Sequence, residues 1–143
     1  MSNDWVKDIA QMHDKFGVHE WVRANSNNKE LMNKFLEFRV KFLEEELNET
    51  KLAFENNDAE EIVDGLIDLC VIAIGTLDAF GVNSYQAWCE VLNANMAKER
   101  GIKPERPNPL GLPDMMKPEG WTAPSHNGNH GQLFNALFTD SVQ

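Results

Sequence analysis

The sequence predicts an all-α fold, a helical bundle of four to five helices followed by an irregular tail. Helix-length segments carry apolar residues at the spacing of a 3.6-residue period as far as residue 100. Short polar breaks separate these segments. All six prolines and most of the late glycines follow Gly101. A length of 143 residues predicts a single domain over residues 1–143, with a core at residues 28–101 and a tail at residues 102–143.

The amino-terminal part predicts two short helical segments. Residues 4–13 form an amphipathic pattern with Trp5 and Ile9 on one side, and the segment is expected to end near Gly17. Residues 18–24 predict one or two further helical turns. The polar break "NSNN" then separates them from the rest of the chain.

Two longer helices are predicted next, over residues 28–55 and residues 58–80. Only the short link "NND" joins them. Helices joined by so short a link are antiparallel neighbours, so the sequence predicts a helical hairpin.

The fourth helix and the tail complete the expected order. Asn83 or Ser84 is expected to cap a helix that runs to Arg100 and ends at Gly101. The proline-rich tail is expected to be irregular and to lie over the surface. Residues 133–138 predict either a short last helix or a peptide that docks on a neighbouring chain.

The first long helix carries acids along its apolar stripe. At about 100° per residue, Glu46 and Glu49 lie deep in the apolar sector, Glu45 lies at its edge and Glu44 lies opposite. The apolar members of that stripe are Leu31, Phe35, Phe38 and Phe42. The glutamates are therefore expected to continue the face that points to the core.

The second long helix is apolar around almost its whole circumference, as expected of a buried helix. Glu61, Asp64 and Asp68, at positions i, i+3 and i+7, form one acidic line along it. In an antiparallel hairpin, Glu46 and Glu49 are expected to face Glu61 and Asp64.

Buried carboxylates crowded together require a positive charge or a proton. Arg39 is the only basic residue near the first stripe, and the second helix contains none. Carboxylates without histidine or thiolate favour a hard cation, Mg²⁺ or Mn²⁺. Two alternatives stay open: a solvated charge run on a helix surface, and, for Glu61 and Asp64, a favourable helix dipole after the N-cap Asp58, which does not account for Asp68.

Composition excludes several classes. A net charge of −10 argues against a nucleic-acid-coating surface, although a small phosphorylated ligand with a divalent ion remains compatible. The sequence has no apolar run of membrane-spanning length and no signal-peptide pattern, so a cytoplasmic location is expected. Cys70 and Cys89 form no metal or redox motif and are expected to be small core residues.

The acidic positions match a known pattern. The chain contains Glu45-Glu46-x-x-Glu49, then eleven residues, then Glu61-x-x-Asp64. This pattern resembles the signature of the all-α nucleoside triphosphate pyrophosphatases. That superfamily includes MazG, dimeric dUTPase and phosphoribosyl-ATP pyrophosphohydrolase. The segment "NANMAK" resembles its Asn-x-x-Lys element, and the tail "KPEGWTAP" resembles the end of MazG-like proteins of bacteriophages. The resemblance covers about residues 28 to 124.

The resemblance implies a hydrolase that cleaves a nucleoside triphosphate between the α and β phosphates, giving a monophosphate and pyrophosphate. It further implies a homodimer or homotetramer with a pocket completed by a second subunit, in the host cytoplasm if the chain is phage-encoded. The implied Mg²⁺ ligands are Glu46, Glu49, Glu61 and Asp64; Glu45 would orient or deprotonate the water, and Asn95 and Lys98 would bind phosphate.

Some residues keep two interpretations. Asp68 lies outside the signature and is either an accessory ligand or a hydrogen-bonding core acid. Lys117 and Trp121 are candidates to close over a phosphate and a base, but a tryptophan in such a tail also caps apolar helix surface. His126 and His130 have the spacing of a zinc pair in a segment too rich in glycine for a helix.

Two other functions compete with this one. A ferritin-like di-iron bundle needs Glu-x-x-His pairs, and no histidine of this chain has an acid three residues before it. A non-catalytic acidic helical adaptor remains open and would be indifferent to Mg²⁺. The sequence does not predict the preferred base or sugar.

Overall fold

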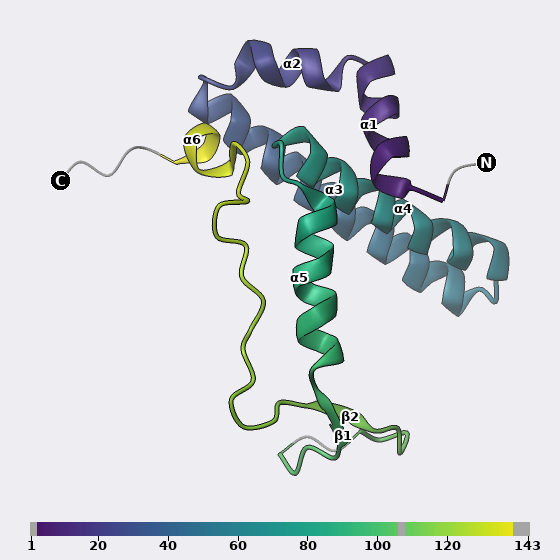
Figure 1. The fold of residues 1–143 in the computed structure, drawn as a ribbon. Helices are drawn as coiled ribbons and strands as arrows, with labels where there is room; N and C mark the ends of the chain where they lie inside the picture. The colour runs from purple at the N-terminus through teal and green to yellow at the C-terminus, as the bar shows by residue number, and fades with distance from the viewer. Residues whose placement is uncertain (1–2, 106–107, 139–143) are drawn as a thin grey trace. The chain divides into compact units, whose positions relative to one another are not determined.

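The all-α prediction is confirmed. A computed structural model describes residues 3–105 and 108–138, which form six helices and one two-stranded sheet (Figure 1). There are more helices than the four to five predicted, because both short amino-terminal segments form complete helices and Leu133–Leu137 adds a sixth. The elements are α1 (Trp5–Lys15), α2 (Val18–Asn25), α3 (Lys29–Glu55), α4 (Ala59–Ala79), α5 (Ser84–Met96), β1 (Glu99–Gly101), β2 (Asp114–Met116) and α6 (Leu133–Leu137).

The chain divides into two compact units. The first contains α1 to α4 and α6, and the second runs from Tyr85 to Asn129 and contains most of α5 and the small sheet. This division does not test whether the 143 residues fold as one domain, so the single domain stays a prediction.

Local signals set the ends of α1 and α2. The Asp4 side chain accepts a hydrogen bond from the Lys7 backbone N–H and so caps α1. Gly17 joins the two helices at φ 78°, in the left-handed region that favours glycine. The predicted turn or two after Gly17 is an eight-residue helix.

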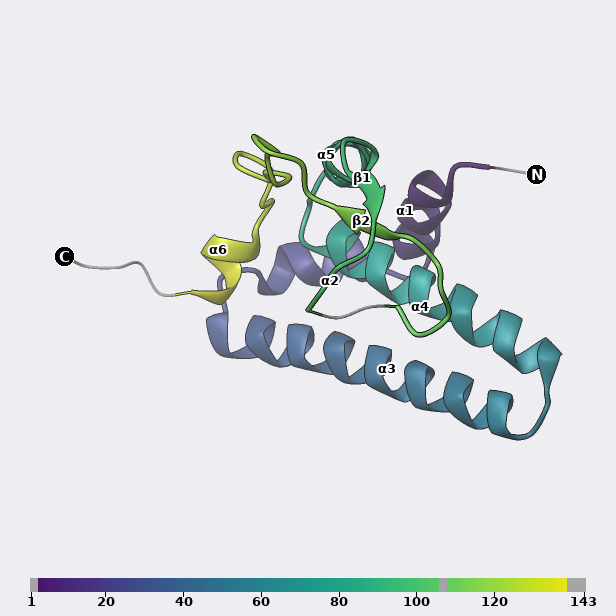
Figure 2. The ribbon, with the colours of Figure 1, turned by 90° about the horizontal axis from the view of Figure 1, so that it is seen from below.

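Helices α3 and α4 form the predicted antiparallel hairpin (Figure 2). Asn28 caps α3 by accepting from the Leu31 N–H, and Asp58 caps α4 by accepting from the Glu61 N–H. A Cβ atom at Gly65 would collide with the Thr50 side chain, so the two helices approach closely at this level. That approach requires glycine.

The core of the first unit lies at the end of the hairpin away from its link. Phe80 and Met32 are fully buried there, among Val22, Ala79, Ala136 and Leu137. Helix α6 is held on this core by backbone and side-chain hydrogen bonds, including Gln132 N–H to the Phe80 carbonyl at 2.6 Å and Asn33 Nδ2 to the Leu137 carbonyl at 2.7 Å. The predicted short last helix is therefore confirmed, and it packs on its own chain.

The prediction that α4 is buried all round is wrong for the single chain. Val63, Leu66 and Ile67 expose 64%, 51% and 44% of their surface. The link end of the hairpin extends beyond α1 and α2 in both views, so no other helix of the first unit covers it (Figures 1 and 2).

The boundary predicted for the fourth helix is also wrong. Helix α5 ends at Met96 rather than at Arg100, and Gly101 lies in a strand. Strand β1 pairs antiparallel with β2, with Glu99 opposite Met116, so the tail is not wholly irregular. Pairing with a segment some fifteen residues away overrides local helix propensity. None of the helices in the described part of the chain combines the length and apolarity needed to cross a bilayer.

Candidate functional site

Four carboxylates gather across the hairpin. Glu46 and Glu49 lie on α3, and Asp64 and Asp68 lie on α4. The charges of Glu49, Asp64 and Asp68 all act on Glu46, and those of Asp64 and Glu49 act on Asp68. We call these four residues the carboxylate cluster. The prediction that Glu46 and Glu49 face an acid of the second helix thus holds for Asp64, whereas Asp68 rather than Glu61 is the fourth member.

Two acids of the cluster hold their protons more tightly than isolated acids do. Partial burial raises the pKa of Glu46, and repulsion from Glu49, Asp68 and Asp64 raises it further. Partial burial also raises the pKa of Asp68, together with repulsion from Asp64 and a hydrogen bond with that residue. Both groups therefore favour a proton or a cation beside them.

Backbone packing holds the cluster in place. Thr50, one turn after Glu46, donates its hydroxyl to the Glu46 carbonyl at 2.8 Å. The same Thr50 side chain fills the space that Gly65 leaves open next to Asp64. Close approach of the helices here brings acids of both helices within range of one another.

The cluster is less buried than the sequence predicts. Glu46 and Asp68 are half-buried, whereas Glu49 and Asp64 are exposed. Among the described residues, no ion pair joins these acids to lysine or arginine.

Arg39 does not neutralise the cluster. Its Nε donates to Thr76 Oγ1 at 3.0 Å and its Nη2 donates to the Ile72 carbonyl at 2.9 Å. Burial lowers the pKa of this guanidinium. The one basic residue near the acidic stripe is therefore engaged with the backbone and side chain of α4.

Glu45 and Glu61 lie outside the strongest interactions of the cluster. Both are exposed, and neither contributes to the raised pKa of Glu46 or Asp68. Glu61 lies in the first turn of α4, where its backbone N–H is capped by Asp58. The catalytic role of Glu45 and the ligand role of Glu61 stay predictions.

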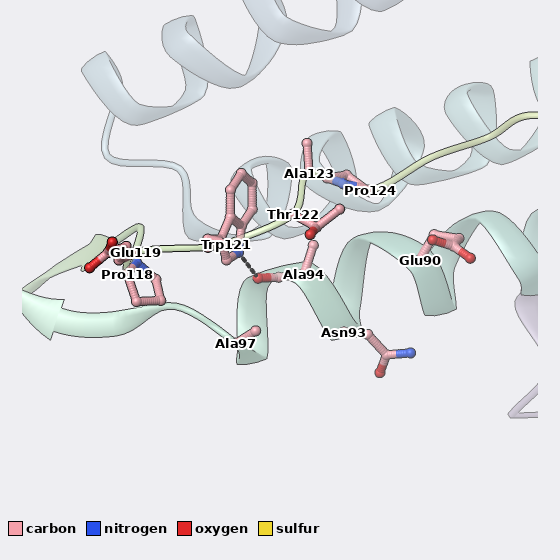
Figure 3. Close-up of a pocket in the computed structure, with 11 residues that line it drawn as sticks. Glu90, Asn93, Ala94, Ala97, Pro118, Glu119, Trp121, Thr122, Ala123 and Pro124 are labelled. Carbon is pink, nitrogen blue, oxygen red and sulfur yellow. Dashed lines mark hydrogen bonds between the residues drawn. The ribbon is translucent and has the colours of Figure 1, made fainter.

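The second unit brings three other candidates together. The Lys98 and Lys117 ammonium groups lie 5.2 and 5.0 Å from the ring centroid of Trp121, within the range of a cation–π contact. The Trp121 indole N–H donates to the Ala94 carbonyl at 2.8 Å (Figure 3). Lys98 follows α5 rather than lying in its last turn, which corrects the sequence-based expectation. Asn95 is half-buried on α5.

A cavity of about 480 Å³ lies beside Trp121. Residues 118–124 form one wall, and α5 supplies Glu90, Asn93, Ala94 and Ala97 (Figure 3). Trp121 is half-buried against α5, so it does cap helix surface as one of the two interpretations expected.

Sequence reasoning missed a cluster in the first unit. His13 Nδ1 and His19 Nε2 each lie 2.7 Å from Asp78 Oδ2. Among the described residues, this is the group whose possible metal-binding atoms all lie within 4.8 Å of one another. No spacing rule links the histidines to an aspartate about sixty residues later. His126 and His130 form no such group within the described residues, and His126 Nδ1 is buried without a hydrogen-bond partner there.

The raised acid pKa values predict how stability depends on pH. Folded Glu46 and Asp68 hold protons more tightly than the unfolded chain, so without divalent metal the free energy of unfolding is expected to fall as pH rises above about 4 to 5 and through these raised pKa values. Asp68→Asn should reduce this fall and so raise the metal-free melting temperature at pH 7. The gain in the free energy of unfolding should be no more than about 1 kcal/mol, because the acids are only partly buried. Thermal melts from pH 4.5 to 8 in EDTA test this.

Glu44→Gln is the matched control, since Glu44 lies on the far side of α3 and is exposed. The same pH dependence in the wild type, Asp68→Asn and Glu44→Gln would contradict the electrostatic account.

A family comparison agrees with the acidic signature. The family described as phosphoribosyl-ATP pyrophosphohydrolase matches residues 11–95, a segment that contains the whole carboxylate cluster. No curated protein matches the chain significantly. The family match covers more than half of the 143 residues. The chain therefore belongs to the phosphoribosyl-ATP pyrophosphohydrolase family, and it is a pyrophosphohydrolase that acts on phosphoric anhydride bonds.

Proposed function

We propose that this protein is a Mg²⁺-dependent nucleoside triphosphate pyrophosphohydrolase that cleaves a (d)NTP between the α and β phosphates, giving a (d)NMP and pyrophosphate. The carboxylate cluster is the observation that carries the proposal. It lies within the region that the family match covers, and among the described residues it has no basic partner. Family membership also disfavours the alternative of a non-catalytic acidic adaptor.

The donor set fits a hard cation. Carboxylate oxygens at one place, with raised pKa at two of them, are what Mg²⁺ or Mn²⁺ would neutralise. Glu46, Glu49, Glu61 and Asp64 would hold the ion, and Asp68, which interacts with Asp64 and Glu49, would be an accessory ligand. Among the described residues, no three of these acids bring one oxygen each within 4.8 Å of one another, so this set is more open than the group formed by His13, His19 and Asp78.

Each residue has a stated task in this proposal. Bound Mg²⁺ would supply neutralisation of the polyphosphate charge and a lowered pKa for water. Glu45 would accept a proton from the attacking water or hold it in line with phosphorus. Lys98 would bind departing phosphate oxygens, with Asn95 donating a hydrogen bond beside it. Lys117 and Trp121, which contact each other, would cover the substrate.

The role of Lys98 predicts a specific kinetic effect. Lys98→Ala is expected to raise the KM for the triphosphate about tenfold, since a charge-assisted contact contributes about 1.5–3 kcal/mol. Steady-state kinetics at saturating Mg²⁺ measure this. Lys51→Ala, an exposed lysine on α3, is the control. Unchanged KM in Lys98→Ala would remove Lys98 from the substrate site.

Product analysis tests the proposed function itself. The chain would be incubated with Mg²⁺ and a panel of ribo- and deoxynucleoside triphosphates, with products resolved by anion exchange. Monophosphate and pyrophosphate in equal amounts are expected with at least one substrate. Diphosphate with orthophosphate, or no turnover of any triphosphate, would refute the proposed reaction. The panel also identifies the preferred base and sugar.

The exposed apolar residues of α4 support an oligomer. Val63, Leu66 and Ile67 expose surface that a second copy would cover, and we propose a homodimer or homotetramer on this ground. Sedimentation that finds only a 16.3 kDa monomer would contradict it. The segment "KPEGWTAP" further supports a place among MazG-like proteins of the bacteriophage type.

A further inference from the structure

Three elements of the first unit meet at one polar point. His13 lies in the last turn of α1, His19 in the first turn of α2, and Asp78 in the last turn of α4. Their side chains are 5%, 27% and 15% exposed, so the group is largely shielded from water. It belongs to none of the residues that the proposed hydrolysis uses.

The hydrogen bonds fix how the two rings are oriented. Both ring nitrogens lie 2.7 Å from the same oxygen, Asp78 Oδ2, and an ionised carboxylate only accepts. His13 Nδ1 and His19 Nε2 therefore both point at this oxygen. Two imidazole nitrogens and a carboxylate oxygen, all within 4.8 Å, are the ligand types that Zn²⁺ takes.

A neutral imidazole is the form that binds a metal. On the far side of the His19 ring, Asp14 Oδ1 lies 4.0 Å from Nδ1. That distance is longer than a hydrogen bond, so Asp14 contributes its negative charge on that side rather than a fixed contact.

We propose that His13 Nδ1, His19 Nε2 and a carboxylate oxygen of Asp78 bind one divalent transition-metal ion of the Zn²⁺ type, which ties the ends of α1, α2 and α4 together. Each ring proton that now points at Asp78 moves to the other nitrogen of its ring as the metal binds, so His19 Nδ1–H faces Asp14. Water completes the coordination, because three protein ligands leave one tetrahedral position. This site differs in chemistry from the carboxylate cluster, which has only oxygen donors.

A competition titration tests the site directly. Full-length protein freed of metal with EDTA would be exchanged into buffer with excess Mg²⁺, which occupies all-oxygen sites, and titrated with Zn²⁺ against a chromophoric chelator. The wild type is expected to bind one Zn²⁺ per chain. His19→Ala and Asp78→Asn should each weaken binding about tenfold or more. His130→Ala, which alters an exposed histidine outside the group, should bind as the wild type does.

Two further readouts separate a site from a structural network. Zn²⁺ should raise the melting temperature of the wild type but not of His19→Ala. Co²⁺ should give a visible absorption band typical of four-coordinate N and O ligands, and Asp78→Asn should abolish it. Circular dichroism checks that each variant folds. If one variant does not fold, His13→Gln is tested in its place. No Zn²⁺ binding by the wild type, or equal affinity in every variant, would show that the group is only a hydrogen-bond network. No turnover is measured, so this outcome is independent of the proposed reaction.

Discussion

Glu46→Gln and Asp64→Asn are expected to lower the rate of pyrophosphate release by about 100-fold or more, in the range found when one charged contact to a transition state is removed. Each substitution replaces a carboxylate proposed to hold Mg²⁺ with an isosteric amide that binds the ion poorly. A coupled pyrophosphate assay at several Mg²⁺ concentrations measures the effect. Extra Mg²⁺ should rescue neither variant to the wild-type rate.

The same variants should fold normally. Partial burial and repulsion from its acidic neighbours raise the pKa of Glu46, so its neutralisation removes an unfavourable charge from the metal-free chain. The melting temperature of Glu46→Gln in EDTA is expected to equal or exceed that of the wild type at pH 7. Glu44→Gln, on the far side of the same helix, is the matched control and should retain full activity. Near-normal turnover in Glu46→Gln or Asp64→Asn would refute the ligand assignment.

Phe80→Ala should have the largest effect on stability. Phe80 is fully buried at the end of α4, where it contacts the core formed with Met32 and α6. Loss of a buried phenylalanine side chain costs about 3–5 kcal/mol, through lost transfer energy and the cavity left behind. For a chain of this size that lowers the melting temperature by roughly 10 °C. Urea unfolding followed by circular dichroism measures the change.

An exposed phenylalanine provides the control. Phe54, near the end of α3, is 74% exposed, and Phe54→Ala should change the free energy of unfolding by no more than about 0.5 kcal/mol in the single chain. Equal destabilisation by both substitutions would mean that α6 and the end of α4 do not form the core described here. A larger loss in Phe54→Ala would instead place Phe54 in a contact between subunits.

Helix positions followed largely from local chemistry. The side chains of Asn28 and Asp58 satisfy backbone N–H groups three residues later, and such caps can be recognised in a sequence. The end of α5 did not follow, because β1 depends on its pairing with β2. A strand acquires its partner from elsewhere in the chain, so local propensity at Glu99–Gly101 was a poor guide.

The acidic residues show the same division. Their periodicity placed Glu46, Glu49 and Asp64 on facing sides of a hairpin, and the electrostatic coupling between the two helices agrees. Periodicity alone left Asp68 ambiguous, and the structure joins it to Asp64 and Glu49. Periodicity also overestimated how deeply the acids are buried. An apolar helix surface does not show whether the residues that cover it belong to the same chain.

By itself, the sequence determined the all-α class, the hairpin and the acidic signature, because these depend on helical period, caps and link length, which are local properties. Only the tertiary structure decided that His13 and His19 meet Asp78 and that Lys98 and Lys117 meet Trp121. Contacts between residues far apart in the chain depend on how helices pack and pair, and no short-range pattern encodes that packing.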